Sequence, residues 1–316
     1  MINTFSVAFY NLENLFDTEH NEFTLDEDYT PDGEFQWNQD RYQNKIKNLS
    51  KVISNIGLKK SKLPPILLGV SEVENNTVLT DLISSEKLKP FDYDFVHYDS
   101  PDERGIDVAF LYQKKHFELI YSDTYSLYLT DKENNRDFTR DILLISGKLY
   151  NSQIYLIINH WPSRNNGAKN SDTKRVKAAE LVQKIINDIY KENESPKIII
   201  MGDFNDEPKS NSIRNYLMND RLFNPMLTFQ ENKKGSVKYK NKWYMFDQII
   251  VSKNLLNNTN LKFQEANIFD APFLQEKSNK RKGAPKRTYI GKWHQGGFSD
   301  HFPVLTYFKK SNTPLN

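Results

Sequence analysis

The residues best suited to chemistry lie near the C-terminus, where Ser299, Asp300 and His301 lead directly into the apolar segment 302–308. A carboxylate and an imidazole at the entrance of a strand would be held side by side on a rigid scaffold. Such a pair suits a metal ligand beside a group that moves a proton or contacts a phosphate. An Asp-His dipeptide alone is more often an ordinary surface feature, so its meaning depends on its partners.

Polar residues recur along the chain where apolar segments end. Strand ends are where a rigid scaffold presents functional loops. The residues in such positions are Asn11, Glu72, Asn159, His160, Asp203 and Asn205, with Asp247 next to a similar run. Any one of them could be a helix cap or a turn former. Because buried charges are costly unless they are paired or bound to an ion, the whole set predicts a functional site.

The composition restricts the kind of site. The chain has no cysteine, which excludes a disulfide framework, a thiolate metal site and a cysteine nucleophile. Metal ligands must therefore be carboxylates, amides and imidazoles, which favours hard ions such as magnesium or manganese.

The 316 residues contain no linker, internal repeat or low-complexity tract, so we expect a single domain over residues 1–316. No apolar run approaches the roughly 20 residues that a membrane-spanning helix needs. No signal peptide is visible, which favours a cytoplasmic protein, although a trimmed export signal would leave no trace. We expect a monomer.

Charge is uneven along the chain, although the formal net charge is only +2. Residues 13–34 hold nine acidic residues and no lysine or arginine, whereas residues 277–292 hold seven basic residues and no acidic one. A solvent-exposed loop is the simplest interpretation of the acidic segment. The basic segment leads towards His301, so we expect it to bind substrate. The residues expected to do so are Lys280, Arg281, Lys282, Lys286 and Arg287, together with Arg164.

The predicted elements explain how these residues are positioned. Segments rich in Ile, Val, Leu, Tyr and Phe predict strands at 5–11, 66–71, 106–112, 117–128, 141–149, 153–159, 197–201, 246–251 and 304–308. Helices are predicted from Asn38 to Gly57, after Asn75 and over 174–190. Fully apolar strands indicate sheets that are covered on both faces, so we expect a layered α/β protein.

The motifs and their order resemble the endonuclease/exonuclease/phosphatase superfamily. That superfamily includes pancreatic-type deoxyribonucleases, abasic-site endonucleases, sphingomyelinases and inositol polyphosphate phosphatases. The matching motifs are residues 69–75 (Gly-Val-Ser-Glu-Val-Glu-Asn), 159–163 (Asn-His-Trp-Pro-Ser), 202–205 (Gly-Asp-Phe-Asn), 246–252 (Phe-Asp-Gln-Ile-Ile-Val-Ser) and 299–301 (Ser-Asp-His). Five motifs in the family's order are highly specific. The resemblance implies a four-layer α/β/β/α sandwich of two mixed sheets, like deoxyribonuclease I, and metal-dependent hydrolysis of a phosphate ester.

The resemblance also implies how a metal ion would be bound. Glu72 would be the main ligand of Mg²⁺ or Mn²⁺. Asn11 would lie beside it and hold the carboxylate, the metal or a phosphate oxygen. Asp300 would help to bind the metal.

The remaining motif residues would act on the water and the phosphate. Asp203 would position or deprotonate the attacking water, and Asn205 would stabilise the phosphate. His301, oriented by Asp247, would contact the phosphate or move a proton. His160 would point at the phosphate.

Asp107 is an acidic residue inside the otherwise apolar segment 106–112. We expect it to form a second dyad with His160 that mirrors Asp247 with His301. The alternative is a structural ion pair with Arg104.

We therefore predict a divalent-metal-dependent phosphodiester hydrolase, with nuclease activity on nucleic acid as the first interpretation. The alternative is a phosphatase or phosphodiesterase that acts on a small-molecule or lipid phosphoester. Near-neutral charge and the acidic segment 13–34 favour that alternative, whereas the basic segment 277–292 favours nucleic acid. A non-catalytic binding protein on the same fold would need a lost catalytic position, and none is missing. The fold alone does not reveal the substrate.

Overall fold

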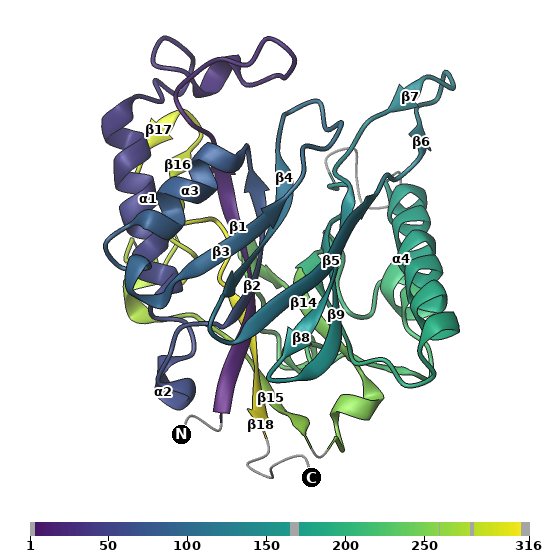
Figure 1. Ribbon diagram of the computed structural model, residues 1–316. Coiled ribbons are helices and arrows are strands. Elements are labelled where there is room, and N and C mark those ends of the chain that lie inside the picture. Colours follow the sequence, from purple (N-terminus) through teal and green to yellow (C-terminus); the bar gives the residue numbers. More distant parts are fainter. Residues whose placement is uncertain (1–3, 165–170, 259, 279–280, 311–316) are drawn as a thin grey trace.

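The computed structural model describes residues 4–164, 171–258, 260–278 and 281–310. Two six-stranded sheets form its centre (Figure 1). The first sheet has the order β15-β18-β1-β2-β4-β3. Its strands are β1 (Thr4–Leu15), β2 (Leu67–Val73), β3 (Tyr93–His97), β4 (Asp107–Gln113), β15 (Leu261–Ile268) and β18 (Val304–Lys310). Strands β1 and β2 are parallel and the other pairs are antiparallel, so this sheet is mixed.

The second sheet is also mixed and has the order β11-β14-β10-β9-β8-β5. Its strands are β5 (Phe117–Tyr125), β8 (Ile142–Leu149), β9 (Ser152–His160), β10 (Ile198–Asp203), β11 (Leu222–Phe223) and β14 (Asp247–Ser252). Here β9 and β10 are the parallel pair. Three hairpins lie outside the sheets: β6 (Leu129–Thr130) with β7 (Arg136–Asp137), β12 (Val237–Tyr239) with β13 (Lys242–Tyr244), and β16 (Tyr289–Ile290) with β17 (Trp293–His294).

Helices cover the outer faces of the two sheets (Figure 1). Helices α1 (Gln39–Ile53) and α3 (Asn76–Ser84) lie on one side, and α4 (Asp172–Glu192) lies on the other. The shorter helices are α2 (Leu58–Ser61), α5 (Leu227–Glu231), the π-helix η3 (Ser212–Leu217) and the 3₁₀ turns η1 (Glu27–Tyr29), η2 (Lys89–Phe91), η4 (Lys253–Leu255) and η5 (Pro272–Leu274). The predicted α/β/β/α sandwich of two mixed sheets is confirmed.

The alternation of side chains in β10 explains why its sequence is apolar throughout. Ile199 and Met201 belong to the core that the two sheets share, whereas Ile198 and Ile200 belong to the core beneath α4. At Gly69 of β2 the two sheets approach closely, because an added Cβ would lie 2.7 Å from the Met201 sulfur. A larger residue at position 69 would therefore require the Met201 and Phe9 side chains to move.

Asparagine side chains cap the two helices that were predicted from Asn38 and after Asn75. The Asn38 side chain accepts a hydrogen bond from the backbone of Arg41 at 3.1 Å. The Asn75 side chain caps α3 in the same way through the backbone of Thr77, at 2.8 Å. Helix α1 ends at Ile53, earlier than predicted, and Gly57 adopts the left-handed conformation (φ 78°) that starts α2.

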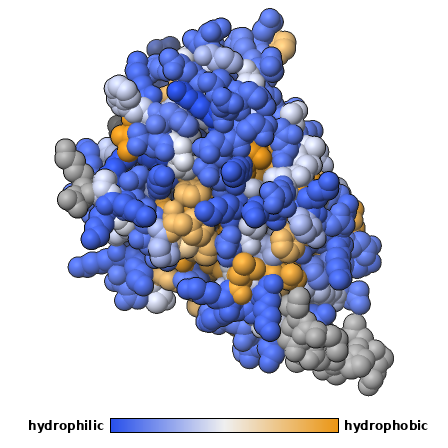
Figure 2. Space-filling view, turned by 90° about the vertical axis from the view of Figure 1, so that its left-hand side faces the viewer, coloured by the Kyte–Doolittle hydropathy of each residue, from blue (hydrophilic) through white to orange (hydrophobic). Residues whose placement is uncertain are grey.

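The outer face on the α1 side is mostly hydrophilic, and its apolar groups form small scattered patches (Figure 2). Helix α1 fits this picture because it buries residues such as Leu49 and Ile53 and exposes most of its polar residues, with Lys45 and Ser50 as buried exceptions. Among the described residues, no helix is long and apolar enough to cross a membrane.

Candidate active site

Strand register in the second sheet places three of the predicted site residues in a row. Asp203, the last residue of β10, lies opposite Asp247 of β14 on one side and His160 of β9 on the other. Gly202 allows this close arrangement, because an added Cβ would lie 2.2 Å from the Asn159 carbonyl oxygen. The β-pairing therefore explains how residues far apart in the sequence meet.

Irregularities in the first sheet direct Glu72 and Glu13 towards the same site. The register of β2 with β4 shifts between Ser71 and Val73, and Glu72 lies in this bulge with a left-handed backbone (φ 60°). The register of β1 with β2 also shifts, and Glu13 (φ 53°) there is left-handed too. Such backbone is uncommon for residues other than glycine and clusters at functional sites, where bulges redirect side chains.

Asn11 connects the carboxylates of the two sheets. Its amide nitrogen lies 3.2 Å from Glu72 Oε1 and 3.2 Å from Asp203 Oδ2, and it donates to both. Its amide oxygen accepts a hydrogen bond from the backbone of Glu13 at 2.9 Å. The expectation that Asn11 holds the carboxylate fits this geometry. That Asn11 is also a metal ligand stays a prediction, because an amide oxygen that accepts one hydrogen bond keeps a second lone pair.

Glu72 has only neutral hydrogen-bond donors. Its Oε2 accepts from the Asn14 backbone at 2.9 Å, and its Oε1 lies 3.8 Å from His160 Nε2. Burial, together with the charges of Arg140, Arg104 and His301, holds the pKa of His160 well below its usual value, so the imidazole is neutral. No lysine or arginine in the described ranges pairs with Glu72, although only 14% of its side chain is exposed. A largely buried carboxylate without a cation suits a metal ion.

The predicted Asp247–His301 pair is present. Asp247 Oδ2 lies 2.7 Å from His301 Nδ1, which fixes the orientation of the ring. Burial alone would lower the pKa of His301, but Asp247, Asp300 and Asp203 together raise it well above its usual value. His301 Nε2 lies 3.9 Å from Asp203 Oδ2, so the protonated ring faces the centre of the site.

Asp203 is suited to accept a proton near neutral pH. Burial and the neighbouring charge of Asp247 raise the pKa of Asp203 to about 7. Its Oδ1 accepts from the Asn205 backbone at 2.9 Å, and Asn205 is itself left-handed (φ 49°). One N–H of the Asn205 amide donates to the Trp161 carbonyl at 3.0 Å, which leaves its second N–H for another acceptor.

A cavity of about 260 Å³ adjoins these residues and is lined by three carboxylates, those of Glu13, Glu72 and Asp300. Carboxylate oxygens of this kind, with no sulfur donor, fit a hard divalent cation such as Mg²⁺ or Mn²⁺. Arg287 lies within the cavity wall, where it pairs with Asp300 and lies 3.5 Å from Glu13 Oε1. Among the described residues, Glu72 is thus the carboxylate of the three that forms no ion pair with a lysine or arginine.

Glu13 is a site residue that the sequence analysis missed. Its Oε2 accepts from the Thr288 backbone at 2.6 Å and lies 3.8 Å from the buried amine of Lys45. Burial and Asp300 raise the pKa of Glu13 to about 7, against the opposing effect of Lys45 and Arg287. The acidic segment 13–34 is therefore not simply a solvated loop. Its position two residues after Asn11 was the available signal.

The predicted dyad of Asp107 with His160 is wrong. Asp107 Oδ2 lies 3.1 Å from His97 Nε2, and its Oδ1 accepts from the Ser100 backbone at 2.9 Å. His160 Nδ1 has no hydrogen-bond partner among the described residues. The alternative ion pair with Arg104 is also absent there, since Arg104 donates to the Asn14 side chain. Asp107 thus joins β4 to His97 of the neighbouring strand β3.

The basic residues fall into two groups. Arg164 is not a free substrate ligand, because it donates to the Asn205 carbonyl at 2.7 Å, pairs with Asp206 and covers the Phe246 ring. Arg281 and Arg287 line a cavity beside Asp300, whereas Lys282 is exposed. Lys286 is half-buried, and Lys280 lies outside the described residues. The roles of these residues in substrate binding stay predictions.

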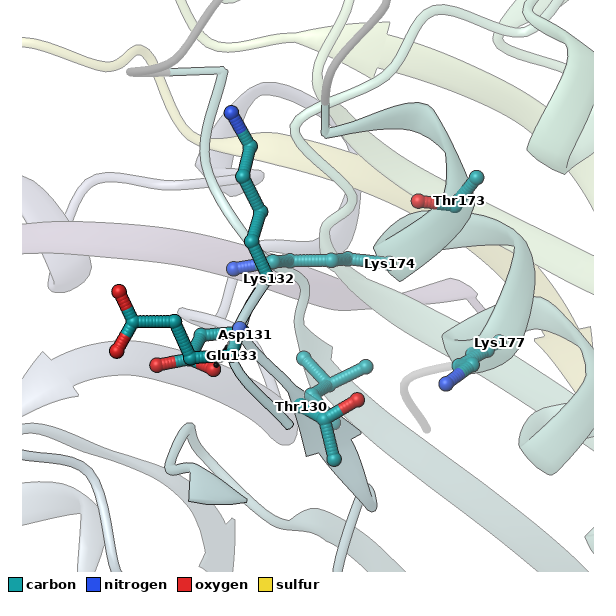
Figure 3. A pocket seen from close by; sticks show the side chains of 8 residues that line it. Thr130, Asp131, Lys132, Glu133, Thr173, Lys174 and Lys177 are labelled. Atoms are coloured by element: carbon teal, nitrogen blue, oxygen red, sulfur yellow. Dashed lines mark hydrogen bonds between the residues drawn. The ribbon is translucent and has the colours of Figure 1, made fainter. Parts of the chain in front are cut away.

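Another cavity, of about 600 Å³, lies between the β6–β7 turn and the start of α4 (Figure 3). Lys132 of the turn and Lys177 of the helix line it, and Lys174 reaches across to pair with Asp137. None of the predicted site residues lines this cavity, so its larger volume does not make it the active site.

Comparisons with known proteins agree with this arrangement. The family model of the Endonuclease/Exonuclease/phosphatase family matches residues 6–310. D. rerio TDP2 in complex with a single-strand DNA product has a TM-score of 0.59 and 15% identity, with 97% of this chain and 99% of that chain covered. A Bacteroides thetaiotaomicron family protein has a TM-score of 0.60 and 16% identity, over 98% and 96%. The mannosyl-6-phosphatase Bt3783 of the same species has a TM-score of 0.59 and 16% identity, over 96% and 99%. No curated protein matched.

The two mixed sheets, with acidic residues and histidines gathered at one end of their strands, define a phosphoesterase fold of the deoxyribonuclease-I type. Because the family model extends over nearly the whole chain, the chain belongs to the Endonuclease/Exonuclease/phosphatase family. Members of this family hydrolyse phosphoesters. Identities of 13–16% to the solved structures establish the fold and leave the substrate open.

Proposed function

We propose that this protein is a divalent-metal-dependent phosphodiester hydrolase that cleaves nucleic acid. The observation that carries the proposal is the environment of Glu72. This carboxylate lies in a strained bulge, is held by neutral amide donors and lacks a cationic partner among the described residues. The amide nitrogen of Asn11 donates to both Glu72 and Asp203, so it links Glu72 to the opposite sheet.

Glu72 and Asp300, with Glu13 nearby, would hold Mg²⁺ or Mn²⁺. When bound, the ion would neutralise charge that develops on the phosphoryl oxygens. Asp203 would take a proton from the attacking water, since its pKa lies near neutrality. His301, kept protonated by Asp247, would donate to a phosphoryl oxygen or to the leaving oxygen. His160 would act as a neutral donor, and Arg164 would position Asn205 through the backbone.

The second candidate is a phosphatase that acts on a small phosphoester. The cavity of about 260 Å³ favours it, because aromatic residues such as Tyr29, Phe35 and Tyr289 line it beside Glu72. A space of this size fits one ring-sized group better than a duplex. A solved structure of similar fold is described as a mannosyl-6-phosphatase, and another is described as a complex with a single-strand DNA product, so both kinds of ligand occur on related scaffolds.

A substrate panel tests the proposal. Plasmid DNA, single-stranded DNA, RNA, bis-p-nitrophenyl phosphate and a phosphate monoester would each be incubated with magnesium, manganese or EDTA. We expect metal-dependent cleavage of at least one nucleic acid and of bis-p-nitrophenyl phosphate. Cleavage of the monoester alone would replace this proposal with the phosphatase.

Glu72→Gln should abolish most of this activity, with Glu118→Gln as the matched control. Glu118 is an exposed glutamate on β5 that pairs with Lys148, away from the site. Full turnover by dialysed wild-type protein in EDTA would rule out the metal-dependent mechanism. A complete lack of turnover on every substrate with either metal would favour a non-catalytic binding protein.

A further inference from the structure

A second cavity shares a wall with the candidate active site. Its volume is about 450 Å³, and Arg287 and Asp300 line both this cavity and the smaller one beside Glu72. The pair formed by Arg287 and Asp300 therefore separates the two spaces. On the far side, the wall is made by the hairpin β12–β13 and by the segment 281–285.

The charge of this second cavity is strongly positive. Lys238, Lys240 and Arg281 line it in addition to Arg287, whereas Asp300 is its one acidic lining residue. Within the described ranges of the chain, Lys238, Lys240 and Arg281 form no ion pair with a carboxylate. The Lys238 amine lies 3.2 Å from the Lys282 carbonyl oxygen, and the Lys240 amine lies over the Tyr239 ring at 5.3 Å. Cations that lack anionic partners in one cavity suit an anionic ligand.

The hairpin that carries these lysines is attached to the catalytic candidates through its backbone. Val237 forms an isolated antiparallel bridge with His301, so Lys238 directly follows a residue that is paired with the histidine. Ser236 accepts a hydrogen bond from the Phe302 backbone at 2.8 Å and, through its side chain, from the Asp247 backbone at 3.2 Å. A turn of only two residues, Lys240 and Asn241, closes the hairpin. The backbone that carries the two lysines is thus held at a defined position relative to His301.

We propose that this cavity binds a second phosphate group of the same substrate, next to the phosphate that is hydrolysed. The inference rests on the function proposed above and names a subsite for it. The second phosphate can belong to the next nucleotide of a strand or to a small bisphosphorylated molecule. Tyr239, which is 59% exposed, offers a ring on which a base or sugar can stack. Neither hairpin lysine contacts the carboxylates Glu72 and Asp203, so this subsite is separate from the reacting centre.

The test compares two triple variants. Lys238→Gln with Lys240→Gln and Arg281→Gln removes three of the four cations that line the cavity and leaves Arg287 paired with Asp300. The control carries Lys59→Gln, Lys114→Gln and Lys148→Gln, which are exposed lysines at the opposite end of the molecule. Substrates are a short single-stranded DNA, a sugar bisphosphate and bis-p-nitrophenyl phosphate, which has a single phosphate. Thermal unfolding checks the fold, and Lys240→Gln at the exposed tip of the hairpin substitutes for the triple variant if that variant unfolds.

We call the Lys238→Gln, Lys240→Gln, Arg281→Gln protein the cavity variant. We expect its KM to rise at least tenfold for the single-stranded DNA or the sugar bisphosphate, while its kcat changes less than twofold. Its kcat/KM on bis-p-nitrophenyl phosphate should match the control. With DNA, the log–log salt dependence of binding should flatten by about 0.7 for each lost phosphate contact. If KM rises only for DNA, the second phosphate belongs to a nucleic-acid strand. If KM rises only for the sugar bisphosphate, it belongs to a small molecule.

Binding measured in EDTA by fluorescence anisotropy, with a labelled oligonucleotide and the sugar bisphosphate as competitor, separates this inference from the proposed function. If the wild type hydrolyses nothing but the cavity variant binds at least tenfold more weakly than the control, the subsite stands and the proposed activity fails. Equal KM and equal binding for both variants overturn the subsite. An equal loss of activity on bis-p-nitrophenyl phosphate overturns it as well.

Discussion

At the scale of single residues, the site is defined by which cationic side chain, if any, pairs with each carboxylate. Asp300 has Arg287, Asp247 has His301, and Glu13 has Lys45 and Arg287, but Glu72 has only neutral donors. The strand-end pattern in the sequence identified most of these positions because polar residues after buried strands must meet at an edge. It did not identify Glu13, because the bulge that turns this residue inwards depends on tertiary pairing and only its position two residues after Asn11 pointed to it.

Asp203→Asn and His301→Ala should each lower kcat by about two to four orders of magnitude, the usual range for lost proton transfer or electrostatic stabilisation. The two side chains lie 3.9 Å apart, so they act on the same transition state. The double variant should therefore be little worse than the poorer single variant. Steady-state kinetics on bis-p-nitrophenyl phosphate measures this, and fully additive losses would show that the residues act independently.

Asp247→Asn should move the alkaline limit of activity to lower pH. Asp247 is the largest of the influences that raise the pKa of His301, and they exceed the lowering effect of burial. The protonated form of His301 is present below its pKa and is lost as pH rises through that value. Removing the carboxylate lowers this pKa, so the charged imidazole is lost earlier. A pH–rate profile, with an NMR titration of the His301 ring, measures the shift, and identical profiles would contradict the assigned orientation.

At the scale of elements, the sequence predicted the central strands, the edge strand β5 and the three long helices, but it missed the edge strands β3, β11 and β15 and the hairpins. Strand β3 (Tyr93–His97) has mixed polarity, with three of its five residues only partly buried, and so carried no clear signal. That omission explains the error at Asp107, whose partner His97 belongs to β3. The hairpin β12–β13 was missed because its strands are short and polar, yet it is bonded to His301.

Asp107→Ala should destabilise the protein without a large effect on the chemistry. The substitution leaves His97 Nε2 and the Ser100 backbone without their buried acceptor. We expect a loss of about 1–3 kcal/mol in unfolding free energy, typical of an unsatisfied buried donor. Urea denaturation measures the loss, and kcat at a temperature where the variant is folded should stay within about threefold. A hundredfold fall in kcat of the folded variant would return Asp107 to the catalytic set.

At the scale of the whole molecule, the site lies where two sheets meet, and neither sheet alone holds it. The first sheet supplies Asn11 and Glu72, and the second supplies His160, Asp203 and Asp247. The layered fold was predictable from strands that are apolar on both faces. The residue pairing across the interface was not, because it depends on close approaches such as that of Gly69 and Met201.

Metal binding should stabilise the whole fold, because the ion would bind an acidic site that is assembled only in the native state. An ion at one hundred times its dissociation constant adds about 2.7 kcal/mol to the unfolding free energy. For a chain of 316 residues, with an unfolding entropy of about 2.1 cal/mol/K per residue, that corresponds to a rise in Tm of roughly 4 °C. Differential scanning calorimetry of chelator-treated protein, with and without magnesium or manganese, measures this rise in Tm without relying on turnover.

The variant Glu118→Gln should keep the full metal-induced rise in Tm. Glu72→Gln should lose most of it, because the remaining carboxylates of the cavity, Glu13 and Asp300, are already paired with Arg287. An undiminished rise in Tm for Glu72→Gln would place the ion elsewhere in the protein.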